Sequence, residues 1–417
     1  MPARTLAVWL HDIQVARLSE PSPFRLRLDF TEEALDVFGE GSRVLSLALP
    51  MSKRPLRDAE VRSSGHTVSA FVEGLLPEGN VRQHIASQAG LPVTDTMGLL
   101  ERVGRECAGA VQFLPEGDVP GTGNVRTLSA REVDTLVADL PIYHLPEGAT
   151  FQASLAGVQD KVLVVALPDG GWGWPEGGAP STHIIKPEPL VGALPHLIQT
   201  EDWALRAARQ ANIPAAESRL AKFELREAIV VTRYDRSATG ERLHQEDFCQ
   251  ALGLDPQAKY ESTAESDRHG SRLKRIARTA AARAHDPDAF RIALLEAVTF
   301  NVVIGNGDAH SKNYSVMLHR DGSVSLAPVY DVAPTFYLDS RYKGTGHVIN
   351  GKTSVDSVEV DDLVGEAVSW GTSARRARAA VAAVLERIRA AVDLVPLPSG
   401  AEHVKGNLET LWTRRSW

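Results

Sequence analysis

The sequence predicts an α+β fold in which a mixed β lobe is followed by a mainly helical lobe. Strand-like alternation of apolar and polar residues and short β-branched runs characterise the chain up to Thr232. Helical periodicity dominates after that residue, apart from one expected hairpin. The chain has 417 residues, of which 43% are apolar, so it can bury a large core, and its length favours two or three domains.

Residues 1–115 form the first expected domain, which is rich in strands. The stretch from Phe24 to Phe30 alternates as a half-buried strand should, and short helices are expected around 75–88 and 97–104. Pro and Gly are frequent over 114–123, which predicts a linker. We therefore place the first domain boundary after residue 115.

Residues 116–232 form the second expected domain, the nucleotide-binding sheet lobe. An apolar, β-branched run from Val162 to Leu167 predicts a strand, and Ser181 to Lys186 predicts the strand that returns beside it. The glycine-rich residues 168–178 between them predict a long closing loop. A helix near 196–211 and a strand from Ala228 to Thr232 complete this lobe.

Residues 233–417 form the third expected domain, the helical catalytic lobe, and a predicted hairpin at 314–330 interrupts it. The Asp-Gly pair at 321–322 is a hairpin turn signal, and the residues on both sides of it alternate as strands do. Asn313 and Asp331 each lie nine residues from the glycine of this turn, so the hairpin brings them to the same open end. Mg²⁺ prefers hard oxygen ligands and usually keeps water and substrate phosphates in its remaining positions. We therefore predict that Asn313 and Asp331 bind Mg²⁺ beside a nucleotide.

Asp308 and Asn313 have the Asp-x-x-x-x-Asn spacing of kinase catalytic loops. In such loops the aspartate takes up the proton of the substrate hydroxyl, so we interpret Asp308 as the catalytic base of an ATP-dependent kinase. Each residue alone also suits a structural role. Asp308 and Asn313 are typical turn residues, and Asp331 suits the cap of a helix that begins at Val332. Their joint placement around one hairpin favours the active site.

Phosphoryl transfer also needs cations on the phosphates, because its transition state is held mostly by electrostatic interactions. Lys186 ends an apolar strand, as the phosphate-binding lysine of kinases does, and the structural alternative is a solvated lysine at a sheet edge. Glu201 in the next helix is either the carboxylate that orients Lys186 or a first-turn glutamate favoured by the helix dipole. His310 either contacts the nucleotide or is a loop histidine bound to backbone carbonyls. Lys312 is expected to be a solvated loop charge and not a phosphate ligand.

Composition limits the other classes of function. The formal charge of −8 comes from 45 basic and 53 acidic residues spread along the chain, so direct nucleic-acid binding has little support. Cys107 and Cys249 have no neighbouring zinc ligands, and we expect both to be buried apolar residues. No stretch approaches the length of a signal-peptide core or a membrane span, so we expect a cytoplasmic protein.

An ordered series of motifs extends over most of the chain. In order they are Gly74-Leu75-Leu76-Pro77-Glu78, Gly109-Ala110-Val111, Ser154 to Lys161, Thr182 to Lys186, Arg233-Tyr234-Asp235-Arg236, Gln245-Glu246-Asp247, Lys259-Tyr260-Glu261-Ser262, Asn306 to Asn313 and Tyr330-Asp331-Val332. With these motifs the sequence resembles the HipA-like serine/threonine kinases, toxin components of bacterial toxin–antitoxin pairs. Thr232 is a departure, because an acidic residue is expected at this place beside the hinge strand.

The resemblance implies a protein-kinase-like, two-lobed fold that uses ATP and Mg²⁺. It implies Asp308 as catalytic base, Asn313 and Asp331 as Mg²⁺ ligands, and Lys186 as the phosphate-binding lysine. It also implies that Ser154 is autophosphorylated and that its loop then leaves the active site. The loop that covers the phosphates then consists of Ser154, Leu155, Ala156, Gly157 and Val158.

The resemblance also implies a substrate and a partner. The implied substrate class is an aminoacyl-tRNA synthetase, whose phosphorylation stops translation and promotes growth arrest and persistence. The implied partner is a small helix-turn-helix antitoxin that binds operator DNA, so this acidic chain would contact DNA only indirectly. No membrane contact is implied.

Two alternatives remain beside the protein kinase. A small-molecule kinase of the aminoglycoside or lipid type shares the Asp-x-x-x-x-Asn loop, although the N-terminal domain with its own motifs argues against it. A catalytically weak kinase fold that acts as corepressor with the antitoxin is the second alternative. The presence of Lys186, Asp308, Asn313 and Asp331 argues against loss of activity.

Overall fold

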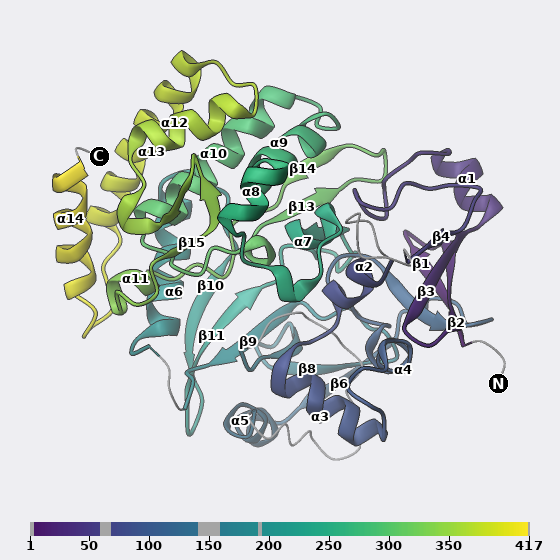
Figure 1. Cartoon of the computed structure of the whole chain (residues 1–417). Helices are drawn as coiled ribbons and strands as arrows, with labels where there is room; N and C mark the ends of the chain where they lie inside the picture. Colours follow the sequence, from purple (N-terminus) through teal and green to yellow (C-terminus); the bar gives the residue numbers. More distant parts are fainter. Residues whose placement is uncertain (1–3, 59–67, 141–158, 191–193, 416–417) are drawn as a thin grey trace. The chain divides into compact units, whose positions relative to one another are not determined.

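The structure is a computed structural model, and it describes residues 4–58, 68–140, 159–190 and 194–415 (Figure 1). The chain divides into two compact units, each built from segments that are not continuous in sequence. The domain boundaries predicted after residues 115 and 232 stay predictions. The first unit contains Met1–Pro187, Ala221–Pro256 and Leu318–Gly322, and the second contains Glu188–Leu220, Gln257–Met317 and Ser323–Trp417.

The first unit contains a five-stranded antiparallel sheet with the strand order β4-β3-β2-β1-β5. The strand predicted near Phe24 is confirmed as β3. Leu26 and Leu28 of β3 are buried because alternate residues of a strand face the same side of the sheet. The bounds are β1 Thr5–Leu10, β2 Ile13–Ser22, β3 Arg25–Phe30, β4 Leu56–Arg57 and β5 Gln112–Pro115.

Short helices accompany this sheet, with α2 packed on β3 and α4 packed on β5. The two helices predicted around 75–88 and 97–104 are confirmed as α3 and α4. Helix α2 was not predicted, because it is buried around most of its circumference and so lacks a polar face that would reveal the helical period. The helices of the whole first unit are α1 Glu32–Phe38, α2 Val68–Leu75, α3 Gly79–Ala89, α4 Thr96–Val103, α5 Ala130–Ala138, which packs on the second sheet, and, directly after strand β12 (Gln245–Asp247), α7 Phe248–Leu252.

A second sheet has the strand order β10-β11-β9-β7-β8-β6. The predicted pairing of the strands around Leu163 and Ile184 is confirmed, since these residues face each other in the antiparallel pair β7–β9. The prediction of a closing loop over 168–178 is wrong in part, because Trp172–Glu176 forms β8 and pairs with β6 and β7. Burial of Trp174 outweighs the low strand propensity of the glycine and proline beside it. The other bounds are β6 Asn124–Leu128, β7 Val162–Ala166, β9 His183–Pro187, β10 Ser218–Lys222 and β11 Glu227–Thr232.

The core of the first unit joins both sheets. One cluster of buried side chains includes Leu28 and Phe113 from the first sheet and Val164 and Val230 from the second. Cys107 and Cys249 are both buried free thiols, as predicted.

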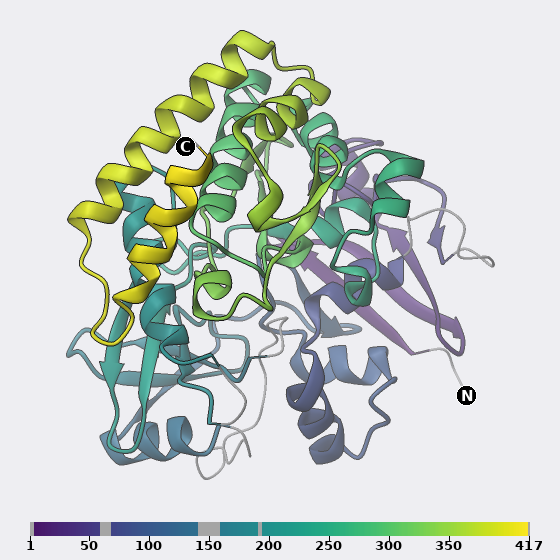
Figure 2. The same ribbon diagram turned by 60° about the vertical axis from the view of Figure 1, so that its left-hand side comes forward.

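The second unit is mainly helical, as predicted for the C-terminal part of the chain. The long helix α13, yellow-green in Figure 2, packs against α6, α10 and α12. The helix predicted near 196–211 is confirmed as α6. None of the described helices is both long and apolar enough to cross a membrane. The bounds are α6 Leu197–Gln210, α8 Thr263–His269, α9 Arg272–Ala281, α10 Pro287–Val303, α11 Thr335–Leu338, α12 Val360–Ser369, α13 Ala374–Leu394 and α14 His403–Arg415.

Two hairpins interrupt these helices. The predicted hairpin is confirmed as β13 (Ser315–Leu318) and β14 (Val324–Leu326), and Gly322 in its turn has a φ of 81°. A second hairpin, β15 (Gly344–Ile349) and β16 (Lys352–Ser354), was not predicted. Its strands are short and rich in glycine and polar residues, so they lack the alternation that predicts a strand.

Candidate active site

The segment between α10 and β13 forms a compact loop that carries Asp308 and Asn313. Gly305 follows α10 with a φ of 77°, a conformation that glycine adopts without strain. The backbone N–H of His310 donates to the carbonyl of Asp308 (2.8 Å), and the N–H of Asn313 donates to the carbonyl of His310 (2.9 Å). A single 3₁₀ turn, Ser311–Asn313, ends the loop. The five-residue spacing is therefore folded into one tight turn.

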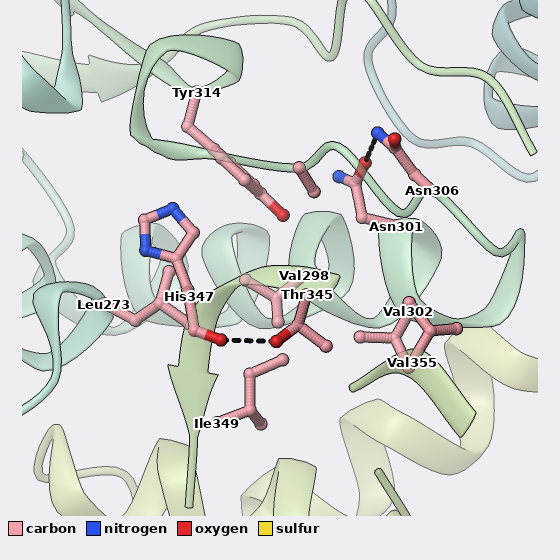
Figure 3. Close-up of a pocket in the computed structure, with 11 residues that line it drawn as sticks. Leu273, Val298, Asn301, Val302, Asn306, Tyr314, Thr345, His347, Ile349 and Val355 are labelled. Atoms are coloured by element: carbon pink, nitrogen blue, oxygen red, sulfur yellow. Dashed lines mark hydrogen bonds between the residues drawn. The ribbon is translucent and has the colours of Figure 1, made fainter. Parts of the chain in front are cut away.

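Asn306 ties the start of this loop to helix α10. Its amide nitrogen donates to Oδ1 of Asn301 (2.7 Å), and its own Oδ1 accepts the backbone N–H of Asp308 (3.1 Å). Figure 3 shows this asparagine pair at the rim of a pocket that Tyr314 and His347 also line. Hydrogen bonds through Asn306 thus join the start of the loop to helix α10.

The three predicted polar residues come together in the second unit. The amide nitrogen of Asn313 donates to the carbonyl of Asp308 (2.8 Å), which fixes the amide plane. Asp331 lies close enough for its negative charge to raise the pKa of Asp308, and it has a φ of 54°, rare for a residue other than glycine. The structural alternative for Asp331 is wrong, because the next helix, α11, begins at Thr335 and has Pro334 as its N-cap.

Burial raises the pKa of the Asp308 carboxyl above its ordinary value. The charge of Asp331 adds to the increase, whereas a hydrogen bond from the hydroxyl of Tyr260 and the positive charge of Lys259 oppose it. A carboxylate with a raised pKa accepts a proton more readily than a solvated one, so Asp308 suits the role of general base.

His310 and Lys312 are both buried. The ring of His310 meets the ring of Tyr260 edge-on, with 5.0 Å between the ring centroids. Burial, with a contribution from Lys259, lowers the pKa of His310 to about 4, so its ring is neutral near pH 7. A neutral ring can stack on a base or donate one hydrogen bond. The expectation of a solvated Lys312 is wrong, because the 3₁₀ turn holds this residue against the packed loop.

Lys186 is buried in β9, which lies between β11 and β7 in the second sheet. It pairs with Ile229 of β11, so the alternative of a solvated lysine on an edge strand is wrong. Glu201 is buried within α6, beyond its first turn, which contains no acidic residue. The helix-dipole alternative for Glu201 is therefore wrong as well. Lys186 belongs to the first unit and Glu201 to the second, and their pairing stays a prediction.

Ser154, Leu155, Ala156, Gly157 and Val158, the predicted phosphate-covering residues, lie outside the described part of the chain.

The Arg-Tyr-Asp-Arg motif forms a buried network of ion pairs in the first unit. Glu106 accepts hydrogen bonds from Arg233 (3.0 Å) and Arg236 (2.8 Å), and Arg233 also binds Asp235 (2.7 Å). The pKa of Asp235 lies below its ordinary value although burial opposes this, because the two arginines stabilise the carboxylate. This motif therefore has a structural role. At the neighbouring Thr232, the hydroxyl lies 3.3 Å from Nε2 of His183.

Three residues that shape the loop were not assigned a role from the sequence. Tyr260 contacts Asp308, Arg272 binds the segment next to the loop, and Gly346 of β15 lies directly against the loop backbone. A Cβ atom on Gly346 would lie 2.2 Å from the carbonyl oxygen of Ala309. Of these three residues, only Tyr260 belongs to a motif that was identified in the sequence. That motif did not indicate that Tyr260 contacts Asp308.

The donor set suits Mg²⁺ better than a metal that is bound by protein side chains alone. In the described part of the chain, no group of three or more His, Cys, Asp or Glu side chains is arranged to hold a metal. The fixed amide of Asn313 and the neighbouring carboxylate of Asp331 provide hard oxygen donors, and Mg²⁺ sites beside nucleotides commonly need only one or two such groups. The residues thus fit this ion when phosphate and water complete its shell.

Comparisons with known proteins cover both parts of the chain. Residues 6–114 match the model of the HipA N-terminal domain, and residues 153–392 match that of the HipA-like C-terminal domain. The putative kinase Y4mE of Sinorhizobium fredii is 31% identical over 415 residues, which cover 94% of this chain and 90% of the relative. The serine/threonine-protein kinase toxin HipA of Shewanella oneidensis is 30% identical over 282 residues, which cover 64% of this chain and 63% of that protein.

One solved structure resembles almost the whole chain. It is the complex of HipA, HipB and operator DNA from Shewanella oneidensis, and the match covers 98% of this chain and 96% of the other. The TM-score is 0.78 at 24% identity, so this likeness bears on the fold alone.

Proposed function

The chain belongs to the HipA-like family, and on this premise we propose that it is a Mg²⁺- and ATP-dependent serine/threonine protein kinase. The family model of the C-terminal domain spans more than half of the chain, and the predicted protein-kinase-like fold is confirmed by the structural likeness. The observation that carries the proposal is the tight turn that joins Asp308 to Asn313 while Asp331 lies within electrostatic reach.

In the proposed reaction, Asp308 orients the acceptor hydroxyl and takes its proton. The hydroxyl oxygen forms a bond with the γ-phosphorus of ATP, the bond from that phosphorus to the bridging oxygen breaks, and ADP leaves with the electron pair. Asn313 and Asp331 would hold Mg²⁺, which when bound offsets the negative charge of the phosphates. Lys186 and the backbone of 154–158 bind phosphate oxygens, Glu201 orients Lys186, and His310 contacts the nucleotide.

Replacement of Asp308 tests the reaction. Asp308→Ala should abolish transfer of labelled phosphate to protein while calorimetry shows Mg-ATP binding close to that of the wild type. The matched control is Asp267→Ala, since Asp267 is an exposed aspartate on α8 in the same unit. Undiminished transfer by Asp308→Ala would disprove the assignment of the base. Transfer to a metabolite pool instead of protein would favour a small-molecule kinase.

We further propose that the kinase acts as the toxin of a toxin–antitoxin pair. Two findings support this: the relative from Shewanella oneidensis is named a kinase toxin, and the similar solved structure contains HipB and operator DNA. The proposed substrate is an aminoacyl-tRNA synthetase, whose phosphorylation halts translation and leads to growth arrest and persistence. The proposed partner is a helix-turn-helix antitoxin, through which the chain contacts DNA indirectly.

Autophosphorylation of Ser154 is the proposed route of inactivation. A phosphate on this hydroxyl adds nearly two negative charges beside the ATP phosphates, which disfavours nucleotide binding. Peptide mapping after incubation with Mg-ATP tests this route, and a Ser154 peptide that stays unmodified would exclude it. Phosphoproteomics after brief expression, with Asp308→Ala as control, tests the synthetase, since no synthetase peptide should gain phosphate in the control.

A further inference from the structure

The hydroxyl group of Tyr260 is hydrogen-bonded to Asp308, the proposed base. Its phenol oxygen donates a hydrogen bond to Oδ1 of Asp308, although the tyrosine is 53% exposed. Its ring meets His310 edge-on, and the ammonium group of Lys259 lies 5.7 Å from the ring centroid. Tyr260 therefore contacts both the base and the loop that carries it.

The backbone around Tyr260 is held on several sides. The carbonyl of Lys259 accepts the backbone N–H of Ser311 (3.0 Å), so the two segments are joined by a main-chain hydrogen bond. The backbone N–H of Glu261 donates to the carbonyl of Gly346 (3.0 Å), which ties the other side to β15. The position of Tyr260 relative to the loop is thus set by its neighbours on both sides in the chain.

Arg272 reinforces this arrangement from the interior. Its guanidinium group is almost fully buried and donates to the carbonyl of Lys259 (3.0 Å) and to Oγ of Ser311 (3.0 Å). Glu265 neutralises its charge through a direct ion pair. A buried, paired arginine that bridges the two segments resists their separation, because breaking the bridge leaves polar groups unpaired in the interior.

We propose that Tyr260 is a positioning residue for phosphoryl transfer, whose hydroxyl holds Oδ1 of Asp308 so that Oδ2 serves the acceptor hydroxyl. The proposal rests on the proposed kinase function. A carboxylate has two oxygens that can each accept a hydrogen bond, so one can be restrained while the other receives the proton. Restraint before the reaction lowers the cost of aligning the base with the acceptor.

The opposite role, a removable gate, suits this geometry less well. A gate would occupy the place of the acceptor and would have to leave before each turnover. Arg272 donates a hydrogen bond to the carbonyl of Tyr260 (3.4 Å). The backbone of the residues on either side, Lys259 and Glu261, is also hydrogen-bonded, which favours a lasting contact of Tyr260 with Asp308 over one that opens. The two roles also predict opposite effects when the hydroxyl is removed.

Tyr260→Phe is the test, because it removes the hydroxyl and keeps the ring against His310. We expect kcat for phosphate transfer to protein to fall by about tenfold to a hundredfold, the effect of losing one hydrogen bond to a charged group. KM for ATP and the calorimetric affinity for Mg-ATP should stay unchanged. If Tyr260 only stabilised the loop, loss of its hydroxyl would raise KM for ATP and lower the affinity for Mg-ATP, because the same loop carries Asn313. Tyr342→Phe, at a second exposed tyrosine of this unit, should leave all of these values unchanged.

The outcomes separate the inference from the function on which it rests. An active wild type with an equally active or faster Tyr260→Phe variant would overturn the positioning role, and a faster variant would point to a gate. A fall in kcat together with weaker Mg-ATP binding would also overturn it in favour of a structural role. A wild type that binds Mg-ATP and transfers no phosphate would refute the kinase function itself, and the inference with it.

Discussion

Gly346→Ala should disrupt the packing of β15 against the loop that carries Asp308 and Asn313. Gly346 has a φ of 71°, and an added Cβ atom would lie 2.2 Å from the carbonyl oxygen of Ala309 and 2.5 Å from the backbone nitrogen of His310. Such separations are far inside van der Waals contact, and both neighbours are backbone atoms that cannot rotate away. The loop must therefore move when alanine is introduced.

The magnitude has two parts. A residue other than glycine in the left-handed region costs about 1–2 kcal/mol. Displacement of packed backbone adds about 1–3 kcal/mol, as overpacking does in a core. We therefore expect the free energy of unfolding to fall by about 2–5 kcal/mol. Phosphate transfer should fall as well, because the moved backbone carries Asp308 and Asn313.

Gly351→Ala is the matched control. Gly351 lies in the turn of the same hairpin, has a φ of 84°, and has no atom within 4 Å of an added Cβ. Its replacement should cost only the backbone part, about 1–2 kcal/mol, and should leave transfer unchanged. Urea denaturation gives the free energies, and labelled ATP gives the rate. Equal losses of stability in the two variants would refute the reasoning from the close approach.

Three further predictions follow from buried or charged groups. Burial raises the pKa of Glu246 to about 8 from its ordinary 4.5, so the folded protein binds the carboxyl proton more tightly than the unfolded chain does. The free energy of unfolding should therefore fall as the pH rises from about 4.5 to about 8. Glu246→Gln should remove that loss in urea denaturation, and an unchanged pH dependence would contradict it. Arg233→Met removes one of the buried partners of Glu106 and should lower the free energy of unfolding by about 3–5 kcal/mol. No measurable change in urea denaturation would show that this ion pair is dispensable. Asp331→Asn should raise the Mg²⁺ concentration for half-maximal phosphate transfer at least about tenfold, and an unchanged requirement would exclude Asp331 as a ligand.

Local patterns predicted elements well where one face of an element is buried. Strand β3 and the hairpin β13–β14 were predicted because alternation and a turn signal are both contained within a few residues. Helix α2 and strand β8 were missed because their residues follow the tertiary environment and not a local period. In β8, burial of Trp174 decides the conformation.

The surroundings of individual charges were predicted less well than the elements. Lys312 was expected to be solvated and Lys186 had a solvated alternative, but both side chains are buried. Burial of a polar side chain depends on the neighbours that cover it, and these come from distant parts of the chain. Composition and spacing contain little information about them.

The sequence by itself determined elements such as β3 and α6, the Asp-x-x-x-x-Asn spacing and the hairpin that brings Asp331 back toward Asn313, because each of these depends on residues close together in the chain. Tertiary structure alone decided the contacts that hold the base. Tyr260 reaches Asp308 across 48 positions, and Gly346 meets the loop from a later strand. Such contacts depend on how packed segments fit together, and local conformational preference does not encode that fit.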